Sequence, residues 1–133
     1  MRQSTLFSPK LVAGILVALA FGVALYFRIA FPYDKVFVDD LIKFTSFDPY
    51  YHMRLVDSLV LNFPYRIPFD PYAHFPDGVP VTWAPFFDWL LAGIILMLSL
   101  GSPTQHTVDV IGVYFPAVLG ALTVIPVFFI GKV

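Results

Sequence analysis

The chain has no cysteine and no glutamate, and only 13% of its 133 residues are charged. The absence of cysteine excludes disulfide bonds and thiolate metal sites. A soluble domain usually carries about 25% charged residues. Half that level, with a mean hydropathy of +0.80, excludes disorder and argues against a water-soluble globule. The net charge of −1 excludes nucleic-acid binding by bulk electrostatics, so we expect no nucleic-acid partner.

The acidic residues are confined to the middle of the chain. All nine are aspartates, and none lies in the first 33 or the last 24 residues. The segment 34–109 therefore carries nine acids against four bases, a net charge of −5, whereas the two flanking segments carry only bases. This distribution indicates a membrane protein with an acidic middle segment between two apolar ends.

Two long apolar runs, at residues 11–31 and 110–131, are each long enough to cross a bilayer as a helix, which takes about 20 residues. The alternative for the first run is a cleaved signal peptide, but the run continues well past the small-residue pattern at Ala18–Ala20. The second run contains two prolines, which membrane helices tolerate. Its small residues favour close packing against another helix: Gly112, Gly120 and Ala121.

The few basic residues predict the topology. By the positive-inside rule, Arg2 and Lys10 place residues 1–10 in the cytoplasm, and Lys132 places the end of the second span there. The segment 101–109 has no Lys or Arg and reads as external. These statements agree only if residues 86–100, too short to span comfortably, do not cross the membrane.

The sequence therefore predicts an all-α membrane protein in which two transmembrane helices flank a long external loop at 32–109. Within the loop we expect a helix at about 48–61, a proline- and aromatic-rich segment at 62–85, and a short membrane-interface helix at 86–100. The competing interpretation is a three-span chain with the 101–109 linker inside. We expect lipid as a partner, and the family resemblance described below implies the plasma membrane of a prokaryote as the location.

The loop helix begins with a strong start signal. Asp48 is a good N-cap and Pro49 fits the first helical position. The apolar spacing predicts four inward side chains: Met53, Val56, Leu59 and Val60. Arg54 and Asp57 are three residues apart and could pair. After the helix, closely spaced prolines and the turn signal Pro76-Asp77-Gly78 predict extended and turn structure. Capping by itself would account fully for Asp48.

A resemblance gives Asp48 a second interpretation. The block Asp48-Pro-Tyr-Tyr-His-Met-Arg54 resembles the first-external-loop motif of the oligosaccharyltransferase catalytic subunit in its bacterial and archaeal forms. The similarity continues through Asn62-Phe63-Pro64 and His74-Phe75-Pro76-Asp77-Gly78. The run Phe115 to Thr123 is similar to the family's second span. The match thus covers most of the chain in the right order.

The resemblance implies a membrane glycosyltransferase, part of a larger multi-span bundle. Such an enzyme transfers an oligosaccharide from a polyisoprenyl-linked donor to Asn in an Asn-x-Ser/Thr sequon of an acceptor polypeptide. Asp48 then inherits a catalytic role as ligand of a divalent metal, Mg²⁺ or Mn²⁺, which prefers oxygen donors. Ser46 stands where eukaryotic members often have an acid, and His52 replaces a common Asn.

Other polar residues are weaker candidates. His52 lies four residues after Asp48 and could contact the metal or substrate. Arg54 is expected to brace the helix or a loop carboxylate, with phosphate contact as the alternative. Asp88 is expected to be a polar anchor near the membrane interface. The pair at 39–40 could form a second acidic site, although an exposed pair is the default.

The family's remaining motifs do not occur in these 133 residues, so we expect an N-terminal part of a longer enzyme or a split subunit of one, inactive alone, whose remainder is its partner. Two other classes stay open. One is a different membrane glycosyltransferase that uses a polyisoprenyl-phosphate sugar. The other is a small, non-enzymatic membrane scaffold whose acidic loop binds a partner.

Overall fold

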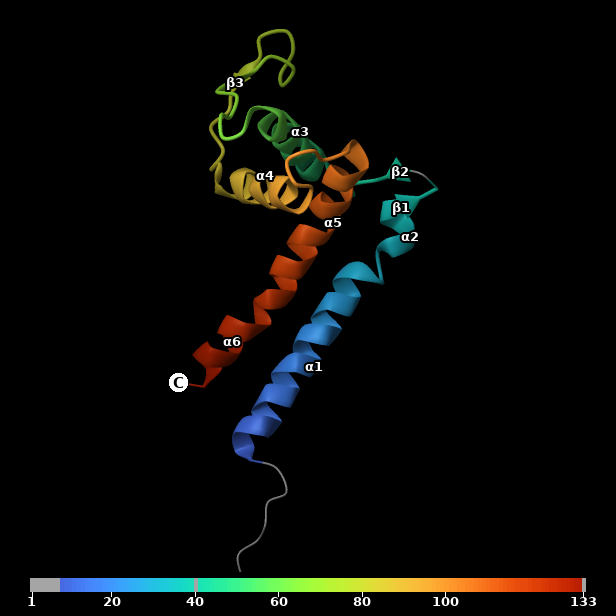
Figure 1. Cartoon of the computed structure of the whole chain (residues 1–133), viewed down its shortest axis with the longest axis vertical. Helices are drawn as coiled ribbons and strands as arrows, with labels where there is room; N and C mark the ends of the chain where they lie inside the picture. The colour runs from blue at the N-terminus through green and yellow to red at the C-terminus, as the bar shows by residue number, and fades with distance from the viewer. Residues whose placement is uncertain (1–7, 40, 133) are drawn as a thin grey trace, which may run out of the picture. The chain divides into compact units, whose positions relative to one another are not determined.

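The computed structural model describes residues 8–39 and 41–132, and it is mostly helical (Figure 1). It divides into two compact units. One comprises Met1–Phe37 and Tyr114–Val133, and the other Val38–Val113. Arg2 of the topology prediction and Asp40 of the acidic pair lie outside the described residues.

The first unit is built on helix α1, Pro9–Ile29. Ser8 caps it by accepting a hydrogen bond from the Leu11 N–H at 3.2 Å, and Pro9 occupies the first turn, where no N–H is needed. No residue of α1 is buried. The short helix α2, Tyr33–Val36, follows. An apolar helix with no buried residue is not the core helix of the described part of the chain.

The second apolar run forms two helices, α5 at Gln105–Leu122 and α6 at Val124–Gly131, separated at Thr123. In the first unit α6 packs against α1. Ala121 is fully buried, and the Arg28 side chain lies against Gly120 so closely that a Cβ there would stand 2.7 Å from its Nε. The predicted small-residue face is thus used for close packing.

Two helical stretches, Pro9–Val36 and Gln105–Gly131, are long and apolar enough to cross a membrane.

The second unit has its core between helices α3, Phe47–Asn62, and α4, Phe86–Leu98, which lie side by side in Figure 1. The start of α5 completes this core. The buried apolar side chains are Met53, Leu55, Val56, Leu59, Leu91, Ala92, Ile95 and Val108. Three of the four predicted inward residues of α3 are buried. Val60 is only half-buried, and Leu55 takes the fourth place.

The chain is not purely α-helical, which corrects the predicted fold class in detail. Strands β1, Phe37–Val38, and β2, Leu41–Ile42, form one two-stranded sheet. Strands β3, Phe69–Asp70, and β4, Val79–Pro80, form another, antiparallel, within the proline-rich segment. The expected extended and turn structure therefore takes the form of a small hairpin.

Gly78 lies where the β3–β4 hairpin turns back. Its N–H donates to the His74 carbonyl at 3.2 Å, and its φ is +69°. A Cβ at this position would stand 2.5 Å from the Phe69 ring and 2.9 Å from the Asp70 carbonyl oxygen. The backbone oxygen cannot move aside as a flexible side chain can, so the turn requires glycine.

We predict that Gly78→Ala destabilises the hairpin by at least the cost of a left-handed alanine, about 1–2 kcal/mol. Limited proteolysis of the full-length protein should then cut the 62–85 segment faster. The matched control is Gly93→Ala in α4, where an added Cβ meets nothing within 4 Å. Equal protease resistance of Gly78→Ala and wild type would contradict this account of the turn.

Candidate functional site

Asp48 lies in the first turn of α3, with an exposed side chain. The predicted cap is wrong in position, because α3 begins at Phe47 and Ser46 occupies the N-cap without a side-chain hydrogen bond. Pro49 fits the first turn, whose amides have no partner within the helix. Within the described residues Asp48 has no hydrogen-bond or ion-pair partner. Its carboxylate is therefore free for another ligand.

His52 lies one turn further along α3 and contacts the carboxylate of Asp88 in the first turn of α4. Its Nδ1 is 2.7 Å from Asp88 Oδ1, and Asp88 is fully buried. Arg66 approaches the other oxygen, with Nη2 at 3.7 Å from Oδ2, and donates from Nη1 to the Trp83 carbonyl. Asp88 is thus a buried, paired carboxylate, and the expectation that it anchors this helix near the membrane interface stays a prediction.

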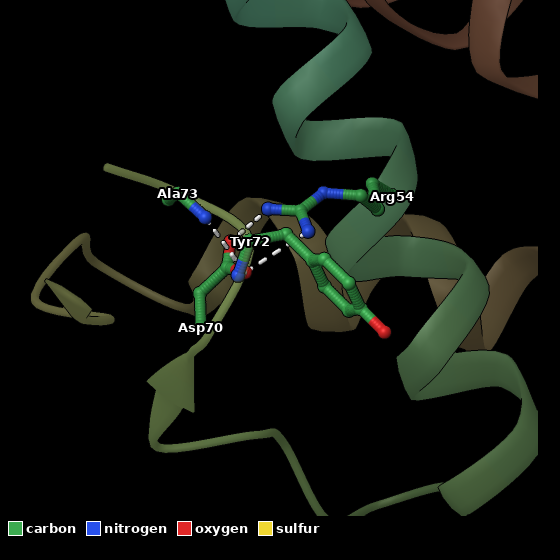
Figure 2. Close-up of polar contacts among 4 residues, drawn as sticks. All are labelled: Arg54, Asp70, Tyr72 and Ala73. Carbon is green, nitrogen blue, oxygen red and sulfur yellow. Dashed lines mark hydrogen bonds and ion pairs between the residues drawn. The ribbon is translucent and has the colours of Figure 1, made fainter. Parts of the chain in front are cut away.

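Arg54 projects from another side of α3 and forms a two-pronged ion pair with Asp70 (Figure 2). Its Nη1 donates to Asp70 Oδ1 at 2.9 Å, and its Nη2 contacts Oδ2. Asp70 is fully buried and also accepts from the backbone N–H groups of Tyr72 and Ala73, at 3.0 and 3.3 Å. The same carboxylate therefore shapes the loop after β3 and fastens it to α3.

These contacts show which carboxylate Arg54 binds, Asp57 on its own helix or one in the loop. The local Arg54–Asp57 pair is wrong, since Arg54 binds Asp70 instead. The expectation that Arg54 braces a loop carboxylate is confirmed. The sequence reasoning missed Asp70 and Arg66 altogether. One signal was present for Asp88, because a single acid within the apolar stretch Phe86–Leu91 has to be paired once that helix is buried.

A pocket of about 610 Å³ lies beside α3 and is lined by aromatic side chains and by both acidic and basic groups, Arg54 among them. Its lining includes Phe47, Tyr50, Asp57 and Asp109, and Gln105 donates to both carboxylates, at 3.2 and 3.1 Å. Burial raises the pKa of Asp57, the Gln105 hydrogen bond lowers it, and the nearby Asp109 charge raises it. Asp48 is not among the lining residues, so this pocket is separate from the candidate metal ligand.

A divalent cation would find a suitable but incomplete donor set here. Asp48 offers oxygen, the donor that Mg²⁺ and Mn²⁺ prefer. Across residues 8–39 and 41–132, no group of three or more His, Cys, Asp or Glu side chains could hold a metal ion. Asp39, exposed and with a φ of 54°, does not add to such a group. Asp48 would therefore supply one oxygen ligand to such an ion, and the described residues do not complete the site.

Two long apolar helices and a small unit with an exposed, unpaired Asp48 define the class as a helical protein with membrane-type spans. Residues 12–133 match the family model of the N-terminal part of the oligosaccharyl transferase STT3. The chain therefore belongs to the STT3 oligosaccharyl transferase family, as the resemblance of its loop motif predicts.

The curated relatives are archaeal. Over 101 residues the chain is 40% identical to the dolichyl-monophosphooligosaccharide–protein glycotransferase AglB of Haloferax volcanii, covering 75% of this chain and 10% of that protein. Over 92 residues it is 38% identical to dolichyl-phosphooligosaccharide-protein glycotransferase 2 of Archaeoglobus fulgidus, covering 69% and 14%. Glycotransferase 1 of that organism is 32% identical over 111 residues, covering 84% and 17%.

The chain thus spans between a tenth and a fifth of the length of these relatives. No solved structure matches it.

We predict that replacing Arg54 destabilises the second unit more than replacing Asp70 does. Arg54→Met leaves a fully buried carboxylate without its cation and should destabilise the second unit by about 3–5 kcal/mol. Asp70→Asn leaves a 41%-exposed Arg54 that water can solvate, so about 1.5–3 kcal/mol is expected. Thermal unfolding and proteolysis of the full-length protein measure both.

The double variant Arg54→Met/Asp70→Asn closes the cycle and should cost less than the sum of the single variants, because each removes the same interaction. Strict additivity of the three measurements would show that the pair is not coupled in the folded protein.

Proposed function

We propose that the full-length protein is an oligosaccharyltransferase that moves a lipid-linked oligosaccharide onto Asn in Asn-x-Ser/Thr sequons. Membership of the STT3 family supports this proposal. The names of the relatives support a dolichyl-phosphate-linked oligosaccharide as donor and a protein as acceptor. In this assignment the chain contributes two membrane-spanning stretches, the first loop between them and one metal ligand.

The observation that carries the proposal is the contrast between three carboxylates of the second unit. Asp70 and Asp88 are fully buried and bound to basic side chains. Asp48 is exposed and has no partner within the described residues, although it opens the block that resembles the family motif. A helix cap cannot be its role, because that position belongs to Ser46.

Asp48 would hold Mg²⁺ or Mn²⁺ together with ligands from the rest of the enzyme. When bound, such an ion neutralises the charge that develops on the phosphate leaving group. Asp48 itself sits in the first turn of α3, with its side chain exposed. This placement keeps an oxygen donor available at the end of a helix whose orientation is fixed by the Arg54–Asp70 ion pair and the His52–Asp88 hydrogen bond.

We also infer that the N-terminus is cytoplasmic and that residues 32–109 lie on the external face of a prokaryotic plasma membrane. Helix α4 supports the two-span arrangement. Its 13 residues extend about 20 Å, less than the roughly 30 Å of a bilayer core. It also buries Asp88 against α3, a contact that suits a helix lying at the membrane interface with the loop.

We predict that Asp48→Asn reduces sequon glycosylation by the full-length protein at least about a hundredfold, because an amide is a poor ligand for a divalent ion. Stability should change little, since the carboxylate caps nothing. Transfer to a sequon peptide, measured with the purified enzyme at saturating Mn²⁺, provides the assay. Asp77→Asn, an exposed loop aspartate, is the matched control. Activity of Asp48→Asn within a few-fold of wild type would remove the metal role.

The topology can be mapped with single cysteines, because the chain has none of its own. Cysteines elsewhere in the full-length protein are replaced first. A membrane-impermeant maleimide applied to intact cells should label Asp77→Cys and Ser102→Cys, while Lys10→Cys should react only after permeabilisation. Protection of Ser102→Cys together with labelling of Asp77→Cys would instead establish the three-span arrangement.

A further inference from the structure

His52 has two ring nitrogens in different situations. Nδ1 faces the buried Asp88 carboxylate at 2.7 Å. A carboxylate accepts hydrogen bonds and does not donate them, so Nδ1 carries the proton in this contact. Nε2 has no hydrogen-bond partner within the described residues, and it is not among the buried polar atoms that lack one. The side chain is 32% exposed, so Nε2 is accessible at the surface, and in the neutral ring its lone pair would be open to a metal ion.

The ring is also held in direction. The Phe87 ring contacts it edge to face, with the ring centroids 5.8 Å apart, and Asp88 fixes its other edge. Asp88 is in turn approached by Arg66, whose Nη2 lies 3.7 Å from Oδ2. A histidine whose Nδ1–H is fixed by a carboxylate is the arrangement that orients imidazole ligands towards metal ions.

Asp48 and His52 are four residues apart on α3, so both side chains leave the same face of the helix on successive turns. The same spacing brings two ligands to one ion in helical metal sites. Asp48 offers a free carboxylate at the exposed end of this face. The helix geometry therefore puts an oxygen donor and an oriented nitrogen donor one turn apart on the same face of α3.

We propose that His52 is a second protein ligand of the ion held by Asp48, that Asp88 is its positioning residue, and that this nitrogen biases the site toward Mn²⁺ over Mg²⁺. The inference rests on the proposed metal role of Asp48. Imidazole nitrogen binds the later divalent metals better, whereas Mg²⁺ holds to oxygen ligands and water. A histidine serving only as a structural link to Asp88 would leave metal preference unchanged.

Pulsed electron paramagnetic resonance of the full-length protein loaded with Mn²⁺ tests this directly. Nitrogen coordination produces ¹⁴N modulation of the Mn²⁺ echo. We expect this modulation in the wild type and its loss or clear reduction in His52→Gln, with His106→Gln, an exposed histidine in α5, as the unchanged control. Full ¹⁴N modulation in His52→Gln would overturn the proposal.

Ion competition provides the second readout. His52→Gln should weaken Mn²⁺ binding about tenfold and Mg²⁺ binding by less than about twofold, within the range found when metal-site support is removed. Asp88→Asn should shift the ratio the same way. If Asp88→Asn weakens the binding of Mn²⁺ and of Mg²⁺ equally, Asp88 has a structural role only and is not a positioning residue. The result for His52→Gln decides by itself whether His52 is a ligand.

The Asp48→Asn variant distinguishes a failure of the His52 assignment from a failure of the metal role of Asp48. If it abolishes Mn²⁺ binding while His52→Gln keeps the full ¹⁴N signal, only the histidine assignment fails. If Mn²⁺ binds Asp48→Asn as tightly as wild type, the metal role of Asp48 fails, and the inference about His52 fails with it.

Discussion

Helix α3 is held from two sides by buried carboxylates, and the second unit depends on this constraint. His52 and Arg54 are two residues apart, which on an α-helix means a rotation of about 200°. One therefore reaches Asp88 of α4, and the other reaches Asp70 at the end of β3. Each pairing joins α3 to a different part of the chain. Together they fix its rotation about its own axis, and with it the direction in which Asp48 points.

The apolar core cannot supply this specificity. It consists of a few aliphatic side chains between α3, α4 and the start of α5, and such contacts tolerate small rotations of one helix against another. The proline-rich segment contributes almost nothing to the core, since its large aromatic side chains are mostly exposed: Tyr65, Phe69, Tyr72, Phe75 and Trp83. Two of its side chains fasten that segment to the helices: Asp70 binds Arg54 of α3, and Arg66 approaches Asp88 of α4.

The sequence predicts the parts of this structure that local pattern determines. Uncharged runs predict the long helices, and the Asp-Pro start with its apolar spacing predicts α3 to within a residue or two. The pairings could not be predicted in the same way. Arg54 has an acid three residues away in Asp57, yet it binds Asp70, sixteen residues later, because only the folded hairpin brings that carboxylate to the helix.

The pairing of Asp88 could not be predicted from local pattern either. A single aspartate near an aromatic cluster is compatible with the membrane interface and with a buried pair. The difference depends on whether His52 and Arg66 converge on it, which no local pattern encodes. The resemblance of the loop motif identified Asp48 as the residue of interest. It could not say that Asp48 would have no partner among the described residues while Asp70 and Asp88 are bound by basic side chains.

Buried ion pairs are a poor means of gaining stability, because desolvation offsets much of their attraction, and apolar side chains of similar volume often serve as well or better. The Arg54–Asp70 ion pair and the His52–Asp88 hydrogen bond on one 16-residue helix therefore call for a different reason. We interpret them as devices of orientation. A metal ligand on a short loop helix must point at a site completed by other parts of the enzyme, and a rotation of even one residue, about 100°, would turn Asp48 away. The directional polar contacts of Arg54 and His52 on two sides of α3 prevent that rotation. Aliphatic side chains can shift past one another and would permit it.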